Sequence, residues 1–187
     1  VMSLARWWRL ALVAGATAAL HLTFIAPIYW PTGQPPPAGQ RVRIISYNVL
    51  SANRQHDDVL AMLRAENADV ILLIEVNPAW AASLDELSDA YPYQHIVPRD
   101  DNFGISIFSR LPFRDVQTRE FGPAGVPTVV ATFELSEQEV TFVGTHPLPP
   151  GSARMSAYRN EQLSDVAEFV RQQSGPTILA GDLNVTE

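Results

Sequence analysis

Polar side chains that could bind a metal ion or a phosphate stand at the ends of apolar runs in this sequence. Asn48, Glu75 and Asp182 each end or closely follow such a run, and Asn184 comes shortly after Asp182. Burying a carboxylate beside an apolar run is costly unless it is paired or bound to a metal. In open α/β sheets, ligands gather at the carboxyl ends of the strands. We therefore predict that these residues share one polar site at the ends of buried strands.

Each of these residues also has a purely structural interpretation when it is taken alone. Asn48 could be a turn residue, Glu75 could face water at a sheet edge, and Asp182 could open a turn through a side-chain hydrogen bond. His146 follows a strand-like run, and a single histidine in such a place is usually a surface or hydrogen-bonded residue. The joint occurrence of these residues at strand ends favours the shared site over the separate structural interpretations.

The composition limits both the kind of metal ion and the kind of partner. The chain has no cysteine, so a metal ion must be held by oxygen or imidazole ligands, which favours ions of the Mg²⁺, Mn²⁺ or Ca²⁺ type. All 13 basic residues are arginine. Without Arg6 and Arg9, 11 arginines face 20 acids from residue 38 onward, a net charge of −9. This lacks the basic surface of a protein that follows a nucleic-acid backbone.

The run 10–29 contains no charged residue and has the length of a membrane span. Its 20 residues are enough to cross a hydrocarbon core of about 30 Å. Arg6 and Arg9 lie on its N-terminal side, so the positive-inside rule places residue 1 in the cytoplasm and the remainder outside. Interfacial aromatic residues bracket the run: Trp7, Trp8, Tyr29 and Trp30. We predict a membrane anchor over residues 1–30, with the span at about 10–29.

Two alternatives to the membrane span are a cleaved signal peptide and a buried helix of a globular domain. The run is longer than a usual signal-peptide core, and nothing nearby in the sequence is suited to cover a buried helix. His21, inside the run, is either a functional intramembrane residue or a neutral histidine beside a neighbouring helix. The segment 31–39 contains four prolines and reads as a short, semi-rigid linker. A domain over 40–187 follows.

In this domain, apolar runs of strand length alternate with amphipathic helical patterns at both ends, and short strands separated by Pro- and Gly-containing turns fill the middle. This order predicts a mixed α/β sandwich with helices outside two packed sheets. Strands are expected at 41–48, 68–76, 104–109, 113–121, 128–135, 139–145 and 176–181, and helices at 57–67, 78–90 and 153–173.

Five short motifs, in order, resemble those of the DNase I-like endonuclease/exonuclease/phosphatase superfamily. They are Ser-Tyr-Asn48-Val, Ile-Glu75-Val, Gly104-Ile-Ser-Ile-Phe-Ser-Arg110, Thr-His146-Pro and Gly181-Asp182-Leu-Asn184. The resemblance covers residues 41–187, and the apolar segment before a Pro-rich linker is similar to bacterial membrane-anchored members. It implies a four-layer α/β sandwich in which two mixed sheets are flanked by helices.

The resemblance also implies a role for each site residue. Glu75 would be the principal carboxylate ligand of Mg²⁺ or Mn²⁺, with Asn48 supporting the metal and the phosphate. Asp182 would share in the metal site and position or activate the attacking water. Asn184 would hold a phosphoryl oxygen, and His146 would stabilise the phosphoryl oxygens in the transition state.

The sequence departs from the family pattern at its end. The family's C-terminal Asp-His pair has no match after Asn184, so we expect a C-terminally truncated domain that is catalytically inert. Val1-Met2 likewise suggests missing upstream spans. In the helix after His146, a solvated face is favoured over a site role for Arg159 and Gln162. The segment 100–102 is a candidate support for His146.

The leading interpretation is a divalent-metal-dependent phosphoester hydrolase on the cytoplasmic membrane, with its domain on the extracytoplasmic side. Nucleic acid, a lipid headgroup and a small phosphoester all remain open as substrates. The alternative is a membrane-tethered, non-catalytic binding module on a degenerate phosphoesterase fold. A C-terminal Asp-His pair beyond residue 187 would favour the enzyme.

Overall fold

The computed structural model describes residues 4–29 and 41–185, and these fall in two compact units, Val1–Gly39 and Gln40–Glu187. The predicted linker at 31–39 lies outside the described residues. The first unit contains one helix, α1 (Leu4–Tyr29). Within it, Trp7–Ala26 is long and apolar enough to cross a membrane, with a mean hydropathy of 1.6, and its side chains are not buried inside the structure.

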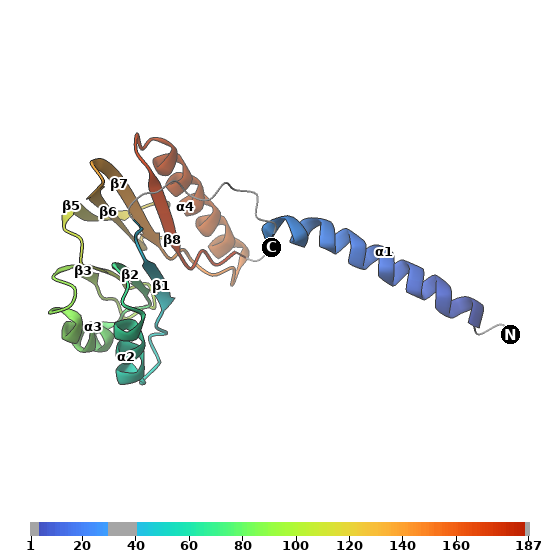
Figure 1. Cartoon of the computed structure of the whole chain (residues 1–187), viewed down its shortest axis with the longest axis horizontal. Helices are drawn as coiled ribbons and strands as arrows, with labels where there is room; N and C mark the ends of the chain where they lie inside the picture. The colour runs from blue at the N-terminus through green and yellow to red at the C-terminus, as the bar shows by residue number, and fades with distance from the viewer. Residues whose placement is uncertain (1–3, 30–40, 186–187) are drawn as a thin grey trace. The chain divides into compact units, whose positions relative to one another are not determined.

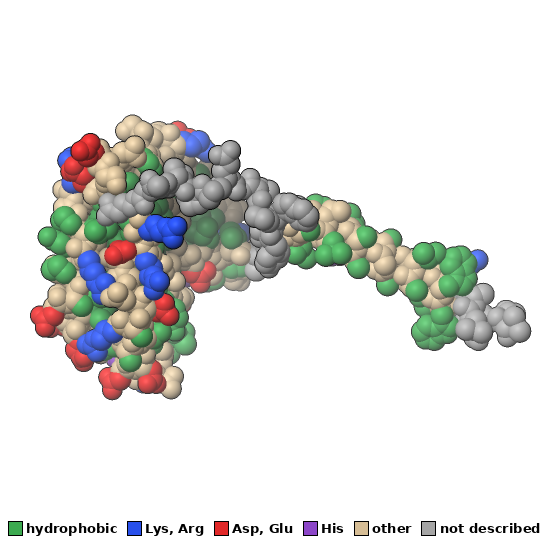
Figure 2. All heavy atoms as spheres, viewed as in Figure 1, with side chains coloured by type: hydrophobic (Ala, Val, Ile, Leu, Met, Phe, Trp, Pro, Cys, Tyr) green, Lys and Arg blue, Asp and Glu red, His purple; other side chains and the backbone are tan. Residues whose placement is uncertain are grey.

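Polar side chains of α1 are hydrogen bonded to the helix itself. The Thr17 hydroxyl donates to the carbonyl of Val13 at 2.9 Å, and Nδ1 of His21 lies 2.8 Å from the carbonyl of Thr17. Apolar side chains cover much of the remaining helix surface (Figure 2). These internal bonds lower the cost of placing Thr17 and His21 in an apolar environment, which suits the span predicted from the sequence.

The second unit contains two four-stranded sheets (Figure 1). Sheet A has the order β1-β2-β4-β3, in which only β1 and β2 are parallel. Sheet B has the order β5-β6-β7-β8, in which only β7 and β8 are parallel. The strands are β1 Ile44–Asn48, β2 Val70–Ile74, β3 Tyr93–Val97, β4 Ile105–Ser109, β5 Phe113–Glu120, β6 Pro127–Leu135, β7 Gln138–Thr145 and β8 Thr177–Gly181.

Helices cover the outer faces of the two sheets. Helix α2 (His56–Glu66), helix α3 (Pro78–Leu84) and the 3₁₀ turn η1 (Asp85–Leu87) pack on sheet A, and α4 (Ala153–Arg171) covers sheet B (Figure 1). The predicted α/β sandwich of two mixed sheets flanked by helices is therefore confirmed.

The alternation of side chains along β2 explains how the layers pack. Val70, Leu72 and Ile74 face sheet B, whereas Ile71 and Leu73 face the helices, so all five residues of this strand are buried. The sheets approach closely at Gly144 of β7, where an added Cβ would lie 2.5 Å from a methyl group of Leu72. A strand buried on both faces reads as a continuous apolar run, which is why β2 was predicted.

Two elements differ from the sequence prediction. The helix predicted at 78–90 ends at Leu84 and continues as η1, because Leu87 and Tyr91 turn inward and are fully buried. Strand β3 was not predicted. It is an edge strand that pairs only with β4, and its sequence, YQHIV, has neither an apolar run nor a clear alternation.

Candidate functional site

The registers of the two parallel strand pairs place the polar residues side by side. Asn48 is the last residue of β1 and pairs with Ile74, the last residue of β2, so Glu75 emerges next to Asn48. The Asn48 Nδ2 group donates to Glu75 Oε1 at 2.8 Å. Thr145 pairs with Gly181 at the ends of β7 and β8, so His146 and Asp182 leave sheet B together.

Packing of the sheets brings the two pairs together. Strand β8 lies against β1 and β2, and both Asp182 and Glu75 act electrostatically on the imidazole of His146. The carboxylates are half-buried, whereas His146 is only 5% exposed. The structure thus places Asn48, Glu75, His146 and Asp182 around one end of the sandwich.

The main chain around Ser51 holds the Glu75 carboxylate. The Ser51 amide donates to Glu75 Oε2 at 3.3 Å, and the Ser51 hydroxyl donates to the Glu75 carbonyl at 2.8 Å. Asn77 caps α3 by accepting from the Trp80 amide and also donates to the Ser51 carbonyl at 2.9 Å. Indole Nε1 of Trp80 donates to the carbonyl of Leu50 at 3.2 Å. Sequence reasoning missed Ser51 and Asn77, because both act through contacts across the fold.

Asn184 sits in a turn that three contacts hold in place. Its main-chain amide donates to Asp182 Oδ1 at 3.0 Å, and its side-chain Nδ2 donates to the carbonyl of Pro147 at 2.8 Å. Arg159 Nη1 donates to the Asn184 carbonyl at 2.8 Å. Arg159 therefore supports the site from α4.

Gln162 does not lie on a solvated helix face, and that prediction was wrong for this residue. It is fully buried, and its Nε2 group donates to Thr145 Oγ1 at 3.1 Å. The Thr145 hydroxyl also pairs with Thr128 Oγ1 at 2.8 Å. An added Cβ at Gly122 would come within 2.9 Å of the Gln162 amide, so the bare glycine lets the loop approach α4. Thr145, which takes part in both of these hydrogen bonds, directly precedes His146 in the chain.

Residues with a positive φ are concentrated around the site. Of the seven described non-glycine residues with positive φ, four belong to it: Leu50 (58°), Glu75 (63°), Asn102 (66°) and Asn184 (51°). Asparagine tolerates this conformation, but a leucine or glutamate there is unusual. Such outliers cluster at functional sites, where the surrounding structure holds them in place. The side chain of Leu50 is nevertheless 56% exposed, so its own packing does not explain the strain.

His146 is buried without a partner for one ring nitrogen. Within the described residues, its Nδ1 has no hydrogen-bond partner, and the ring of Phe103 lies 5.3 Å away. Burial lowers the pKa of His146, while Asp182, Glu75 and a hydrogen bond with the main chain of Asn102 act in the opposite direction. A buried polar atom without a partner requires an explanation, and a ligand in the site would supply one.

A comparison with protein families places the chain in one of them. The model of the Endonuclease/Exonuclease/phosphatase family matches residues 45–187. The chain belongs to this family. Comparison with curated proteins gave no match.

Several solved structures share the phosphoesterase fold of the family. Humanised Danio rerio TDP2 aligns with a TM-score of 0.69 at 21% identity, over 78% of this chain and 63% of that one. Sphingomyelinase C from Streptomyces griseocarneus aligns with a TM-score of 0.63 at 22% identity, over 77% and 64%. A Staphylococcus aureus beta toxin lacking its β-hairpin gives 0.63 at 19%, over 79% and 68%. The chain thus spans less than two thirds of the length of the first two.

The donor set of the site fits a hard divalent cation. Neither Glu75 nor Asp182 forms an ion pair within the part of the chain that the structure describes, although both are half-buried. Mg²⁺ is typically bound through one or two carboxylates and keeps several waters, so the type and number of these ligands fit such an ion. Among residues 4–29 and 41–185, no three His, Asp or Glu side chains are arranged so that they could together hold a metal ion.

The buried His146 and the half-buried His95 predict how stability depends on pH. Burial lowers the pKa of both His146 and His95 below their ordinary value of 6.5. Just below that value, the unfolded chain therefore binds more protons than the native state, and the free energy of unfolding falls as the pH drops from about 6.5. Asp101 and Glu168 have lowered pKa values, and because they are carboxylates they add a loss of stability only at more acidic pH.

Denaturant unfolding at a series of pH values from about 5 to 7.5 would measure this slope around the ordinary histidine pKa. We expect His146→Gln and His95→Gln each to flatten it, and the double substitution to flatten it most. An unchanged slope in the double variant would show that burial of these rings does not control stability in this range.

Proposed function

We propose that the chain is part of a divalent-metal-dependent hydrolase that cleaves phosphoester bonds. The observation that supports this most directly is the meeting of two half-buried carboxylates, Glu75 and Asp182, which have no basic partner among the described residues, with the buried His146. Two carboxylates without a basic partner beside a neutral histidine would destabilise a protein core. The same groups are suited to binding a cation and a phosphate.

Glu75, Asp182 and Asn48 would hold Mg²⁺ or Mn²⁺. When bound, such an ion acts as a Lewis acid that neutralises charge developing on the phosphoryl oxygens. Hydrogen bonds from Ser51 and Asn48 keep the Glu75 carboxylate oriented toward the site. Asp182, which already accepts the amide of Asn184 through Oδ1, would use its other oxygen to orient the attacking water and take its proton.

His146 and Asn184 would donate hydrogen bonds to the phosphoryl oxygens. His146 would donate through Nδ1, which has no hydrogen-bond partner among the described residues, because the negative charge of a bound phosphate favours the protonated ring that carries this hydrogen. Asn184 uses one amide hydrogen on the Pro147 carbonyl and keeps the second for a substrate. Donors held in place before the reaction stabilise developing negative charge without reorganisation.

The charge of the domain bears on which class of phosphoester is the substrate. One neighbour in fold, Danio rerio TDP2, is described in complex with a single-strand DNA product, and another is a sphingomyelinase. On the face shown in Figure 2, basic and acidic side chains alternate without a broad basic stripe. With the net charge of −9, this disfavours duplex DNA and leaves a lipid headgroup or a small phosphoester as the better candidates.

Metal-dependent turnover tests the proposal. The full-length protein should hydrolyse bis(4-nitrophenyl) phosphate, a lipid phosphodiester or single-stranded DNA with Mg²⁺ or Mn²⁺, and EDTA should abolish the activity. Turnover that resists EDTA would contradict the metal role. Binding of Mn²⁺ without turnover of any of these substrates would favour the non-catalytic binding module.

The proposal also places the protein at the cytoplasmic membrane, with α1 as a span and the second unit on the extracytoplasmic side. It is supported by the apolar stretch Trp7–Ala26 and by Arg6 and Arg9, which lie just before it and in its first turn. A reporter pair fused after residue 187 would test it. We expect alkaline phosphatase to be active there and green fluorescent protein to be dark, and the reverse pattern would overturn the orientation.

A further inference from the structure

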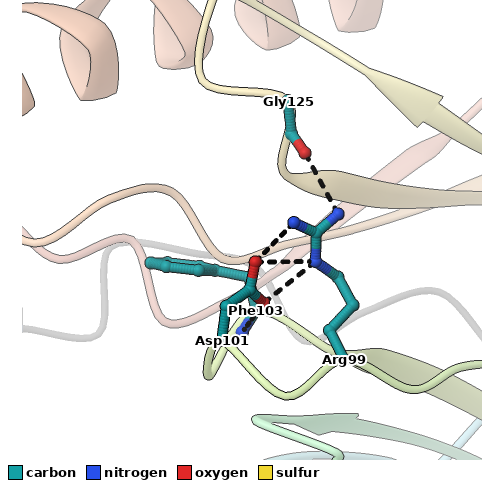
Figure 3. Close-up of polar contacts among 4 residues, drawn as sticks. All are labelled: Arg99, Asp101, Phe103 and Gly125. Carbon is teal, nitrogen blue, oxygen red and sulfur yellow. Dashed lines mark hydrogen bonds and ion pairs between the residues drawn. The ribbon is translucent and has the colours of Figure 1, made fainter.

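Arg99 and Asp101 form a bidentate pair in the loop that leads into β4 (Figure 3). Arg99 Nε donates to both carboxylate oxygens of Asp101, at 2.9 and 3.0 Å, and the Nη2 group contacts the same carboxylate. Asp101 Oδ1 also accepts the amide of Phe103 at 3.2 Å. The hydrogen bond with Arg99 lowers the pKa of Asp101, so the carboxylate stays charged down to acidic pH.

Arg99 also connects this loop to both sheets through hydrogen bonds. Its main-chain amide donates to the Val76 carbonyl at 3.0 Å, directly after Glu75. Its Nη1 group donates to the carbonyl of Gly125 at 3.3 Å, in the turn before β6 (Figure 3). Gly104 closes the loop against Val76, because an added Cβ would lie 1.8 Å from the Val76 carbonyl. The loop is therefore fixed at its start, its middle and its end.

Between these fixed points, two residues of the loop contact His146. The Phe103 ring lies 5.3 Å from the imidazole at an interplanar angle of 39°. The main chain of Asn102, held at a φ of 66°, forms a hydrogen bond with the same imidazole. Both contacts come from the two residues that directly follow Asp101. No side chain of β7 that the structure describes gives His146 a comparable polar contact.

We propose that the Arg99–Asp101 pair is a positioning device for His146. It holds Phe103 and the Asn102 main chain against the imidazole, and thereby fixes the orientation of the ring and excludes water from one side. The catalytic consequence rests on the proposed function, whereas the effect on His146 itself does not. Asp100, the remaining residue of the predicted 100–102 support, has no contact of this kind in the structure.

A second ion pair offers a matched control. Arg64 Nη2 lies 2.9 Å from Glu86, and the side chains are 47% and 59% exposed. Those of Arg99 and Asp101 are 35% and 47% exposed. Surface pairs contribute little to global stability, so neither pair should alter unfolding much. Only the Arg99–Asp101 pair should act on His146.

Chemical modification of His146 measures its protection directly. The full-length protein would be treated with diethyl pyrocarbonate at neutral pH, and the modification rate of each histidine followed by peptide mass spectrometry. We expect Asp101→Ala and Arg99→Gln to raise the rate at His146 about two- to fivefold, the change in local opening that the loss of one exposed ion pair gives. Phe103→Leu should raise it further, and Glu86→Gln should leave it unchanged.

Rates at His56 and His95 in the same samples separate local release from unfolding. A rise at all three histidines would mean that a variant has lost its fold, and an unchanged rate at His146 in both Asp101→Ala and Phe103→Leu would overturn the proposal. In turnover, we expect kcat to fall with KM unchanged, and Asp101→Asn, which keeps an acceptor for the Phe103 amide, to recover part of the loss. Loss of protection in a protein without any phosphoesterase activity would refute the proposed function but not the positioning role.

Discussion

Replacing Glu75 by glutamine is expected to lower metal-dependent phosphoester hydrolysis by about 100-fold or more, the scale seen when a group that stabilises developing charge is removed. The substitution keeps the size of the side chain and removes its charge. Glu75 accepts from Asn48 through one carboxylate oxygen and from the Ser51 amide through the other. Glutamine can satisfy only one of these donors and offers a weaker ligand to a divalent cation.

Thermal unfolding with and without Mn²⁺ separates the effect of Glu75→Gln on metal binding from its effect on stability. We expect Mn²⁺ to raise the melting temperature of the wild-type protein and to have little effect on Glu75→Gln, because only the native wild-type site binds the ion. Without metal, Glu75→Gln should be the less stable protein by about 1 to 3 kcal/mol, because one of the two donors is left without an acceptor. Differential scanning fluorimetry with and without Mn²⁺ measures both.

Glu66→Gln is the matched control for the loss of one charge. Glu66 ends α2, is exposed, and has only a distant ion pair with Arg43 at 3.9 Å, so its substitution should leave turnover and metal binding unchanged. A Glu75→Gln protein that retains the metal-dependent rise in melting temperature would show that the carboxylate is not a principal ligand.

The positions of the site residues were predictable because each stands where a strong apolar signal stops. The continuous run of β2 predicts a buried strand, and a carboxylate at its end has few stable structural roles. The same holds for Asp182 after β8. What the runs do not specify is the pairing of strands, and it is the parallel registers of β1 with β2 and of β7 with β8 that set Asn48 beside Glu75 and His146 beside Asp182.

The supporting residues could not be predicted in the same way. Ser51 reaches Glu75 through its main-chain amide, and a main-chain donor leaves no mark on the sequence. Gln162 is polar and lies on a helix that also carries exposed residues, so a solvated position was favoured, but its hydrogen bond with Thr145 places it in the core. Phe103 acts through a contact with His146, far along the chain, which sequence periodicity cannot reveal.

Replacing His146 by glutamine is expected to lower kcat by about 10²- to 10³-fold, the usual cost of removing one donor to a developing oxyanion. The imidazole is buried, and Glu75 and Asp182 both act on it electrostatically. Because the interaction forms with charge that develops in the transition state, KM should change much less than kcat.

His95→Gln is the control for loss of a partly buried imidazole. His95 lies on β3, its Nε2 is 2.7 Å from Thr118 Oγ1, and burial lowers its pKa as it does for His146, yet it has no contact with the site residues. We expect its activity to match the wild type. Equal losses in the two variants would mean that His146 acts only through stability, and a loss confined to KM would make it a binding residue.

Combining His146→Gln with Asp182→Asn tests whether the two residues act in one step. Groups that stabilise the same transition state have effects far from additive, so the double variant should be only slightly slower than the slower single variant. Strictly additive losses would place His146 and Asp182 in separate steps. Because Thr145 pairs with Gly181 directly before them, the two side chains leave adjacent strands together, and a shared role is what this register supports.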